Sequence, residues 1–151
     1  MGSALARSSR WNRVPGYLAS ASSSISLFVQ IESAAAVERV AEIAAVDGVD
    51  GILVGPADLA ASMGRLGQQD HPEVVDAVLH AIGAAAEAGK PAGVNAFAPD
   101  AAERYLAAGA AFVLVGADVA LLARASEALA DRFIGDAPAA DGGSTSAASQ
   151  Y

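Results

Sequence analysis

The chain contains no cysteine, few aromatic residues and few basic side chains. Without cysteine it has neither a disulfide framework nor a thiolate metal site, which is typical of a protein from a reducing compartment. An aromatic content of 5% beside 54% hydrophobic residues indicates a core of Ala, Val, Leu and Ile, as when helices cover a sheet. With 9 Lys and Arg against 17 Asp and Glu, the net charge of -8 argues against nucleic acid as the main partner.

We expect neither a secretory signal nor a membrane-spanning segment in this sequence. Residues 1–7 do not contain the apolar core that a secretory signal needs. The stretch 105–123 carries one charge, Asp118, and is long enough to cross a bilayer. However, Gly109 and Gly116 interrupt it where turns would flank a strand, and a buried parallel strand is apolar on both faces. We therefore expect a cytoplasmic protein that does not enter a membrane.

The 151 residues suit a single domain in which strands and helices alternate. Apolar runs predict strands at about 27–31, 52–55, 92–97 and 112–115, and periodic segments predict helices at about 34–45, 57–63, 72–88, 99–109 and 120–133. Asp70 is expected to cap the helix at 72–88, which Gly89 ends. Residues 1–25 are a Ser-rich lead-in, 26–134 the domain, and 135–151 a low-complexity tail expected to be disordered.

This order of elements predicts an α/β fold with a parallel sheet and right-handed crossovers. Two architectures satisfy it. A doubly wound sheet could close with about four or five strands, although no Gly-rich dinucleotide or phosphate loop follows any strand. The other is a (β/α)8 TIM barrel, of which about four β/α units would supply half. The periodicity alone does not choose between them.

Two carboxylates stand at the ends of neighbouring predicted strands. Glu32 follows the first strand, and Asp58 follows the second, two residues after Pro56 of the Gly55-Pro56 turn. In parallel α/β folds the carboxyl ends of the strands open onto the ligand. Glu32 and Asp58 are therefore the leading candidates for a shared metal site with oxygen ligands.

Several longer motifs carry a resemblance to a known family. They are GSALAR at 2–7 with SRWNR at 9–13, VQIE at 29–32, the run 46–59, HPEV at 71–74 and VGAD at 115–118. Over about residues 2–133 the chain resembles the carboxyl-terminal half of the HpcH/HpaI aldolase family. That family includes 4-hydroxy-2-oxoheptanedioate aldolases and 2-keto-3-deoxy sugar-acid aldolases.

The resemblance implies a TIM-barrel fold and a class II aldolase that cleaves 4-hydroxy-2-oxo acids to pyruvate and an aldehyde. It implies a divalent cation, Mg²⁺ or Mn²⁺ with Co²⁺ as a third candidate, held by Glu32 and Asp58. Gln30 would line the same site, and the backbone at Ala57 and Asp58 would meet the pyruvate carboxylate. Asn95 stands where some members carry an aliphatic residue, and would favour a polar aldehyde if it borders the aldehyde pocket.

The family pattern also has parts that this chain does not show. In the family four further β/α units precede the GSALAR motif, and they hold the acid/base histidine and an arginine that grips the keto oxygen. We therefore expect an incomplete half-barrel, cut in the middle of the family's barrel, with no secure catalytic acid or base and little activity by itself. The alternative is a non-catalytic interaction module, or a chain that needs a separate first half. Open barrel edges predict a homo-oligomer or other self-association.

Other charged residues have simpler interpretations. His71 precedes Pro72 at a helix start, and His80 lies on a polar helix face, so neither replaces the missing base. Asp47 and Asp50 lie before the second strand and are interpreted as turn residues. The basic residues Arg7, Arg10 and Arg13 with Trp11 are not interpreted as a nucleic-acid arm, because the chain is acidic overall; the resemblance makes this segment a loop near the barrel mouth.

Overall fold

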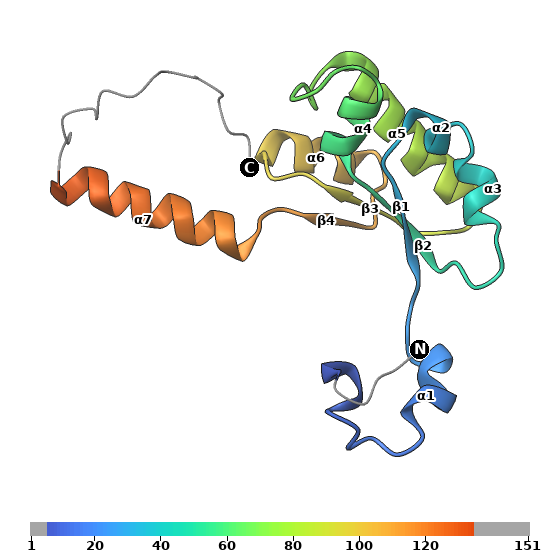
Figure 1. The fold of residues 1–151 in the computed structure, drawn as a ribbon. Coiled ribbons are helices and arrows are strands. Elements are labelled where there is room, and N and C mark those ends of the chain that lie inside the picture. The colour runs from blue at the N-terminus through green and yellow to red at the C-terminus, as the bar shows by residue number, and fades with distance from the viewer. Residues whose placement is uncertain (1–5, 135–151) are drawn as a thin grey trace.

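The computed structural model describes residues 6–134, and these form one parallel sheet with helices on one side (Figure 1). The strands are β1 (Phe28–Ile31), β2 (Gly51–Val54), β3 (Ala92–Asn95) and β4 (Phe112–Leu114). They lie in the order β1-β2-β3-β4, and every neighbouring pair is parallel. The predicted parallel arrangement of contiguous strands is confirmed.

Each strand is followed by helical structure. These helices are α2 (Ala34–Val37), α3 (Val40–Ala44), α4 (Pro56–Ser62), α5 (Pro72–Glu87), α6 (Pro99–Ala107) and α7 (Asp118–Ile134). Proline occupies the first turn of α4, α5 and α6, a position where its missing N–H has no intrahelical role. Within the lead-in are the short helices η1 (Arg7–Ser9), α1 (Tyr17–Ser20) and η2 (Ala21–Ser23).

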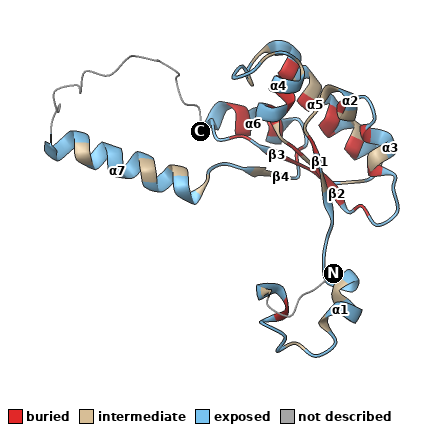
Figure 2. Ribbon diagram, viewed as in Figure 1, coloured by how far each residue is buried: buried red, intermediate tan, exposed pale blue. Residues whose placement is uncertain are grey.

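The hydrophobic core lies between the sheet and the helices that cover it (Figure 2). From the sheet it receives Ile31, Ile52, Val54 and Val94, all fully buried. Helix α5 contributes one apolar face, spaced three and four residues apart: Val74, Val78, Ala81, Ile82 and Ala85. This packing orients the other face of the sheet, with Gln30, Leu53 and Asn95, toward the open side of the structure.

The open face is closed at the amino ends of the strands by two aromatic rings. Phe28 on β1 and Phe112 on β4 meet edge to face, with ring centroids 5.5 Å apart, although these strands lie at opposite edges of the sheet. A Cβ atom on Gly51 or Gly93 would run into one of these rings, so glycine at both positions makes room for them. The sheet is therefore curled, as in part of a barrel, with an apolar floor.

Some element boundaries differ from the predictions. The single helix predicted at 34–45 is two short helices separated at Glu38 and Arg39. The N-cap of α5 is His71, whose Nδ1 accepts the Glu73 N–H at 3.3 Å, so the prediction that Asp70 caps this helix was wrong. The described residues include no helix long and apolar enough to cross a bilayer. The predicted tail at 135–151 lies outside the described residues.

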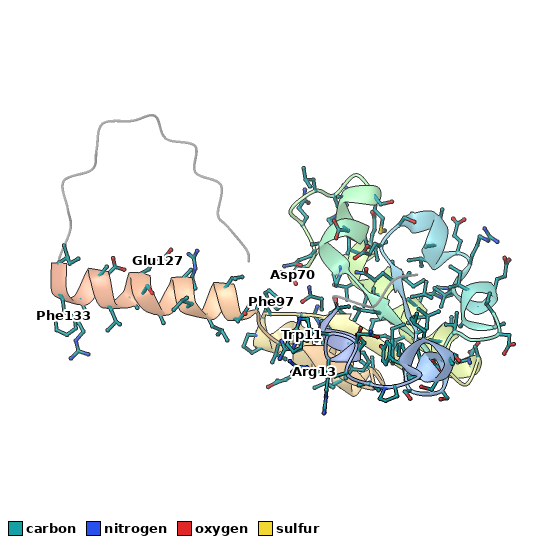
Figure 3. The ribbon with its side chains drawn as sticks, turned by 60° about the horizontal axis from the view of Figure 1, so that its bottom comes forward. Trp11, Arg13, Asp70, Phe97, Glu127 and Phe133 are labelled. Carbon is teal, nitrogen blue, oxygen red and sulfur yellow. The ribbon has the colours of Figure 1, made fainter. Side chains whose placement is uncertain are left out.

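Helix α7 forms as predicted but extends away from the sheet (Figures 1 and 3). None of its residues is buried, and it exposes large apolar side chains, namely Val119, Leu121, Leu122, Leu129, Phe133 and Ile134. Strand β1 and strand β4 each pair on one side only within the described residues. This half-barrel geometry leaves apolar surface and sheet edges exposed.

The lead-in has an unusual backbone. Arg10, Trp11 and Asn12 all have positive φ, at 48°, 54° and 65°, in a region that costs a non-glycine residue about 1–3 kcal/mol. Ser9, which is fully buried, holds this turn: its Oγ accepts the Asn12 N–H at 2.9 Å and donates to the Ala6 carbonyl at 3.1 Å. Since none of these residues is glycine, the sequence did not predict this conformation.

Candidate active site

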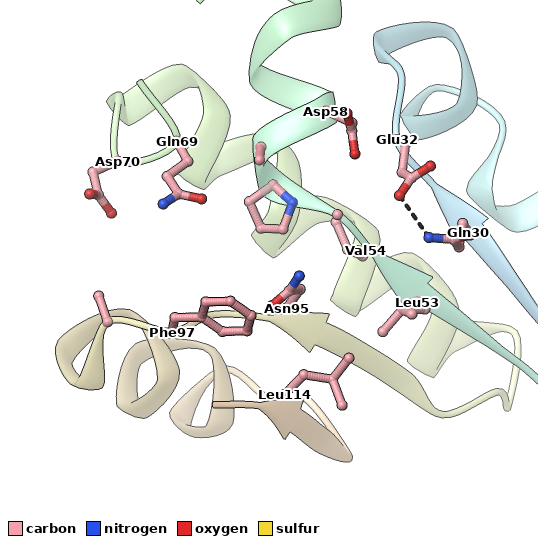
Figure 4. A pocket seen from close by; sticks show the side chains of 14 residues that line it. Gln30, Glu32, Leu53, Val54, Asp58, Gln69, Asp70, Asn95, Phe97 and Leu114 are labelled. Atoms are coloured by element: carbon pink, nitrogen blue, oxygen red, sulfur yellow. Dashed lines mark hydrogen bonds between the residues drawn. The ribbon is translucent and has the colours of Figure 1, made fainter. Parts of the chain in front are cut away.

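A cavity of about 470 Å³ lies at the carboxyl ends of the four strands (Figure 4). Its volume is in the range of ordinary small-molecule sites, about 300–1,000 Å³. The lining includes Gln30, Ala57 and Asp58, which the resemblance assigned to substrate, and Glu32, which it assigned with Asp58 to the metal. Asn95, where the chain departs from some family members, also lines the cavity. The fold therefore brings every site residue expected from the sequence to one cavity.

The end of β1 supplies an acid and the amide that orients it. Gln30 points from the open face of the sheet, and Glu32 follows the last residue of the strand. The Gln30 side-chain amide donates a hydrogen bond to Glu32 Oε1 at 2.7 Å. This bond holds the Glu32 carboxylate in place at the cavity.

Gly55 makes room for that carboxylate. A Cβ atom at Gly55 would lie 2.7 Å from Glu32 Oε1 and 3.0 Å from its Cγ. The backbone at Gly55 has φ −105° and ψ 91°, which any residue can adopt, so the requirement for glycine here is one of space. Gly55 is therefore a positioning residue for Glu32.

We expect Gly55→Ala to weaken Mn²⁺ binding at least about tenfold, or about 1.4 kcal/mol, because the new methyl group displaces the Glu32 carboxylate. Isothermal titration calorimetry measures the affinity. The matched control is Gly83→Ala in α5, where a Cβ meets nothing within 4 Å and alanine suits the helix. Equal Mn²⁺ affinity in the two variants would contradict the positioning role of Gly55.

The second acid comes from the first turn of α4. Gly55 and Pro56 turn the chain at the end of β2, and α4 begins at Pro56. In Figure 4 the Asp58 carboxylate lies on the same side of the cavity as Glu32. The first intrahelical bond of α4 runs from the Leu59 N–H to the Gly55 carbonyl at 3.0 Å, so the Ala57 and Asp58 N–H groups precede the helical bonding pattern.

The opposite side of the cavity contains polar residues that the sequence did not identify. Gln69 and Asp70 line it from the loop before α5, and Phe97 and Leu114 provide apolar walls (Figure 4). The sequence predicts Asp70 only as a helix cap. The sequence places Asp70 two residues before Pro72, and this position is as typical of a helix cap as of a loop residue that lines a cavity.

Asp70 also borders a small extension of about 10 Å³ that reaches Tyr105. Burial raises the pKa of the Tyr105 hydroxyl above its usual value; the Arg104 guanidinium opposes this rise, and the Asp70 carboxylate adds to it. Tyr105 therefore remains a neutral hydroxyl at physiological pH behind this side of the cavity.

The carboxylates of Glu32 and Asp58 fit a hard divalent cation that completes its coordination with water or substrate oxygens. Among residues 6–134 no group of three or more His, Cys, Asp or Glu side chains could hold a metal ion, so Glu32 and Asp58 would be a two-carboxylate site. Mg²⁺ is commonly bound by one or two carboxylates and completes its coordination with water and substrate oxygens. The described cavity lining contains no His, Lys or Arg. His71 caps α5 and His80 is exposed on the same helix; that neither acts as the base stays a prediction.

Comparisons with known proteins agree with the resemblance seen in the motifs. The family model described as HpcH/HpaI aldolase/citrate lyase matches residues 4–125. A relative from Shigella sonnei (strain Ss046), named 4-hydroxy-2-oxo-heptane-1,7-dioate aldolase, is 52% identical over 133 residues, which are 88% of this chain and 51% of the relative. The chain thus spans about half the length of the curated relatives it matches.

Solved structures show the same relationship. A crystal structure of an HpcH/HpaI aldolase/citrate lyase family protein from Burkholderia cenocepacia J2315 matches with a TM-score of 0.74 and 40% identity, over 83% of this chain and 49% of that one. An HpcH/HpaI aldolase from Desulfitobacterium hafniense DCB-2 matches with a TM-score of 0.71 and 28% identity, over 87% and 52%. The four-stranded sheet is thus part of the family's TIM-barrel fold. The chain belongs to the HpcH/HpaI aldolase/citrate lyase family.

Proposed function

We propose that this chain is the metal-binding half of a divalent-metal-dependent class II aldolase that cleaves 4-hydroxy-2-oxo acids to pyruvate and an aldehyde. The observation that carries the proposal is that Glu32 and Asp58, from two neighbouring strand ends, line one cavity of ligand size. Family membership and the 52% identical relative named as an aldolase support the reaction class.

Glu32 and Asp58 would hold the cation, Mg²⁺ or Mn²⁺ or else Co²⁺, and when bound it would supply Lewis-acid polarisation of the 2-oxo group. The other residues orient and bind. Gln30 orients Glu32 through their 2.7 Å hydrogen bond. The Ala57 and Asp58 N–H groups, at the start of α4, are proposed donors to the substrate carboxylate, which matches their place before the first intrahelical bond.

Asn95 is proposed to contact the aldehyde portion of the substrate. It extends from the end of β3 into the cavity, between the carboxylate side and the Phe97 wall (Figure 4). An amide there donates and accepts hydrogen bonds, which an aliphatic residue does not, so a hydroxylated aldehyde would be favoured over an apolar one.

This proposal predicts that pyruvate binds only when a divalent cation is present. Two-dimensional ¹H–¹⁵N NMR of the labelled chain with Mg²⁺ should show pyruvate-induced shifts at Gly55, Ala57 and Asp58. Without Mg²⁺ these shifts should be absent, because the N–H groups alone bind the carboxylate weakly. Acetate, which lacks the keto oxygen, is the control ligand. Shifts that occur equally without Mg²⁺, or far from the cavity, would contradict the proposed binding mode.

We also propose that the protein acts in the cytoplasm on small molecules, with neither nucleic acid nor membrane as partner. Self-association is proposed as well, because the sheet edges at β1 and β4 and the apolar side chains of α7 are exposed.

A further inference from the structure

The side of the cavity away from the metal carboxylates carries a negative charge of its own. Asp70, from the loop before α5, lines the main cavity of about 470 Å³ and also the small extension of about 10 Å³ behind it. In Figure 4 its side chain and those of Glu32 and Asp58 lie on opposite sides of the cavity. A ligand held by its 2-oxo acid end at Glu32 and Asp58 would therefore have Asp70 at the far side of the same cavity.

The charge of Asp70 acts on groups inside this end of the cavity. Burial raises the pKa of the Tyr105 hydroxyl, the Arg104 guanidinium opposes that rise, and the Asp70 carboxylate adds to it. Tyr105 is only 2% exposed and lines the small extension beside Asp70. The negative charge of Asp70 is therefore felt by an enclosed hydroxyl behind the cavity wall.

No positive side chain in the described lining offsets this charge. The residues that line the cavity and its extension include no Lys, Arg or His. Within residues 6–134 the structure records no ion pair for Asp70. Arg65, a basic residue of the same loop, contacts Glu73 instead, with Nη2 3.0 Å from Oε2. A ligand group beside Asp70 thus meets a carboxylate that no described basic side chain neutralises.

We propose that Asp70 selects the far end of the substrate, accepting hydrogen bonds from a hydroxyl group there and disfavouring a carboxylate. A carboxylate side chain only accepts hydrogen bonds, so a substrate hydroxyl is a partner for it and a second carboxylate is not. Two negative charges at this end also repel each other. The inference rests on the proposed function and narrows the aldehyde to one that ends in hydroxyl groups rather than in a carboxylate.

Three seven-carbon 2-oxo acids test this without turnover, because none has the 4-hydroxyl group that retro-aldol cleavage needs. One ends in a hydroxyl group (7-hydroxy-2-oxoheptanoate), one in a carboxylate (2-oxoheptanedioate) and one in a methyl group (2-oxoheptanoate). Calorimetry of the unmodified chain with Mg²⁺ should give an affinity for the hydroxyl-ended acid at least about tenfold above that for the dioate. The methyl-ended acid should lie between them, since it neither bonds to Asp70 nor is repelled by it.

The decisive variant is Asp70→Asn, which keeps the side-chain shape and removes the charge. Its affinity for the dioate should rise about tenfold, whereas its affinity for pyruvate, which has no far end, should stay unchanged. The matched control is Asp76→Asn, an exposed residue of α5 outside the described lining. It makes the same change in net charge and should keep the preference of the unmodified chain.

Pyruvate separates failure of this inference from failure of the proposed function. If pyruvate binds with Mg²⁺ but the unmodified chain holds the hydroxyl-ended acid and the dioate equally well, the inference is overturned and the proposed function stands. The same conclusion follows if Asp70→Asn and Asp76→Asn show the same preference. If pyruvate does not bind to the unmodified chain with Mg²⁺, the proposed function is overturned and this inference with it.

Discussion

Replacing both Glu32 and Asp58 by alanine is expected to abolish Mn²⁺ binding. The two carboxylates line the same cavity, and no third acid, histidine or cysteine among the described residues completes a metal cluster with them. Removing both leaves the neutral Gln30 amide on that side of the cavity and the single Asp70 carboxylate on the opposite side, which do not offset the cost of dehydrating a divalent cation. Calorimetric titration of the double variant should give no binding heat beyond dilution.

Two controls separate the loss of ligands from other effects. Glu38→Ala/Asp76→Ala removes two exposed carboxylates away from the cavity, so it changes the net charge equally and should leave Mn²⁺ affinity unchanged. Glu32→Gln/Asp58→Asn keeps the side-chain shape and should bind as poorly as the alanine variant, because charge is what is lost. Unchanged Mn²⁺ binding in the alanine variant would show that the cation binds elsewhere.

The pairing of these acids could be predicted because each follows a short apolar run. Parallel strands share one carboxyl edge, so acids after consecutive strands must approach each other once the strands pair in order. The register of β1 against β2, with Ile31 opposite Val54, brings this about. Strand order and the helix starts at Pro72 and Pro99 were predictable from the same local patterns.

What the sequence did not predict depends on contacts between distant residues. Phe28 and Phe112 are 84 positions apart, and their contact follows from the curl of the whole sheet. The break at Glu38 and Arg39 has no glycine or proline to mark it. Asp70 was missed because a cap and a loop residue have the same sequence context. Only the fold of the loop before α5 decides between them.

The largest expected effect concerns turnover. We expect this chain alone to show little or no retro-aldol activity, because the described cavity lining offers no His, Lys or Arg to move a proton or polarise a keto oxygen. A general acid or base contributes typically about 10²- to 10⁴-fold, and a positioned cation-like donor about as much. A coupled lactate dehydrogenase assay with Mn²⁺ present measures pyruvate release from 4-hydroxy-2-oxo acids.

Adding the missing groups should restore part of this activity. The resemblance assigns the acid/base histidine and the arginine to the four β/α units that precede the GSALAR motif in the family. The Shigella sonnei relative matches this chain with 52% identity over 51% of its own length. If the resemblance holds, the separately expressed remainder of that relative would supply those units. The open sheet edges at β1 and β4 are where the added strands would pair. Mixing the two halves should therefore raise turnover by at least about a hundredfold.

The pattern of rescue distinguishes a catalytic half-site from a non-catalytic interaction module. If Glu32 and Asp58 hold the cation, the rescued activity must disappear when this chain carries Glu32→Ala/Asp58→Ala, whereas Glu38→Ala/Asp76→Ala should be rescued as well as the unmodified chain. If the mixture has the same turnover with Glu32→Ala/Asp58→Ala as with the unmodified chain, the added half is active without the carboxylates of this chain. Ordinary turnover by this chain without any partner would instead require a base within it, and the search would then turn to Asp70 and the cavity carboxylates, since His71 is engaged at the start of α5 and His80 is exposed.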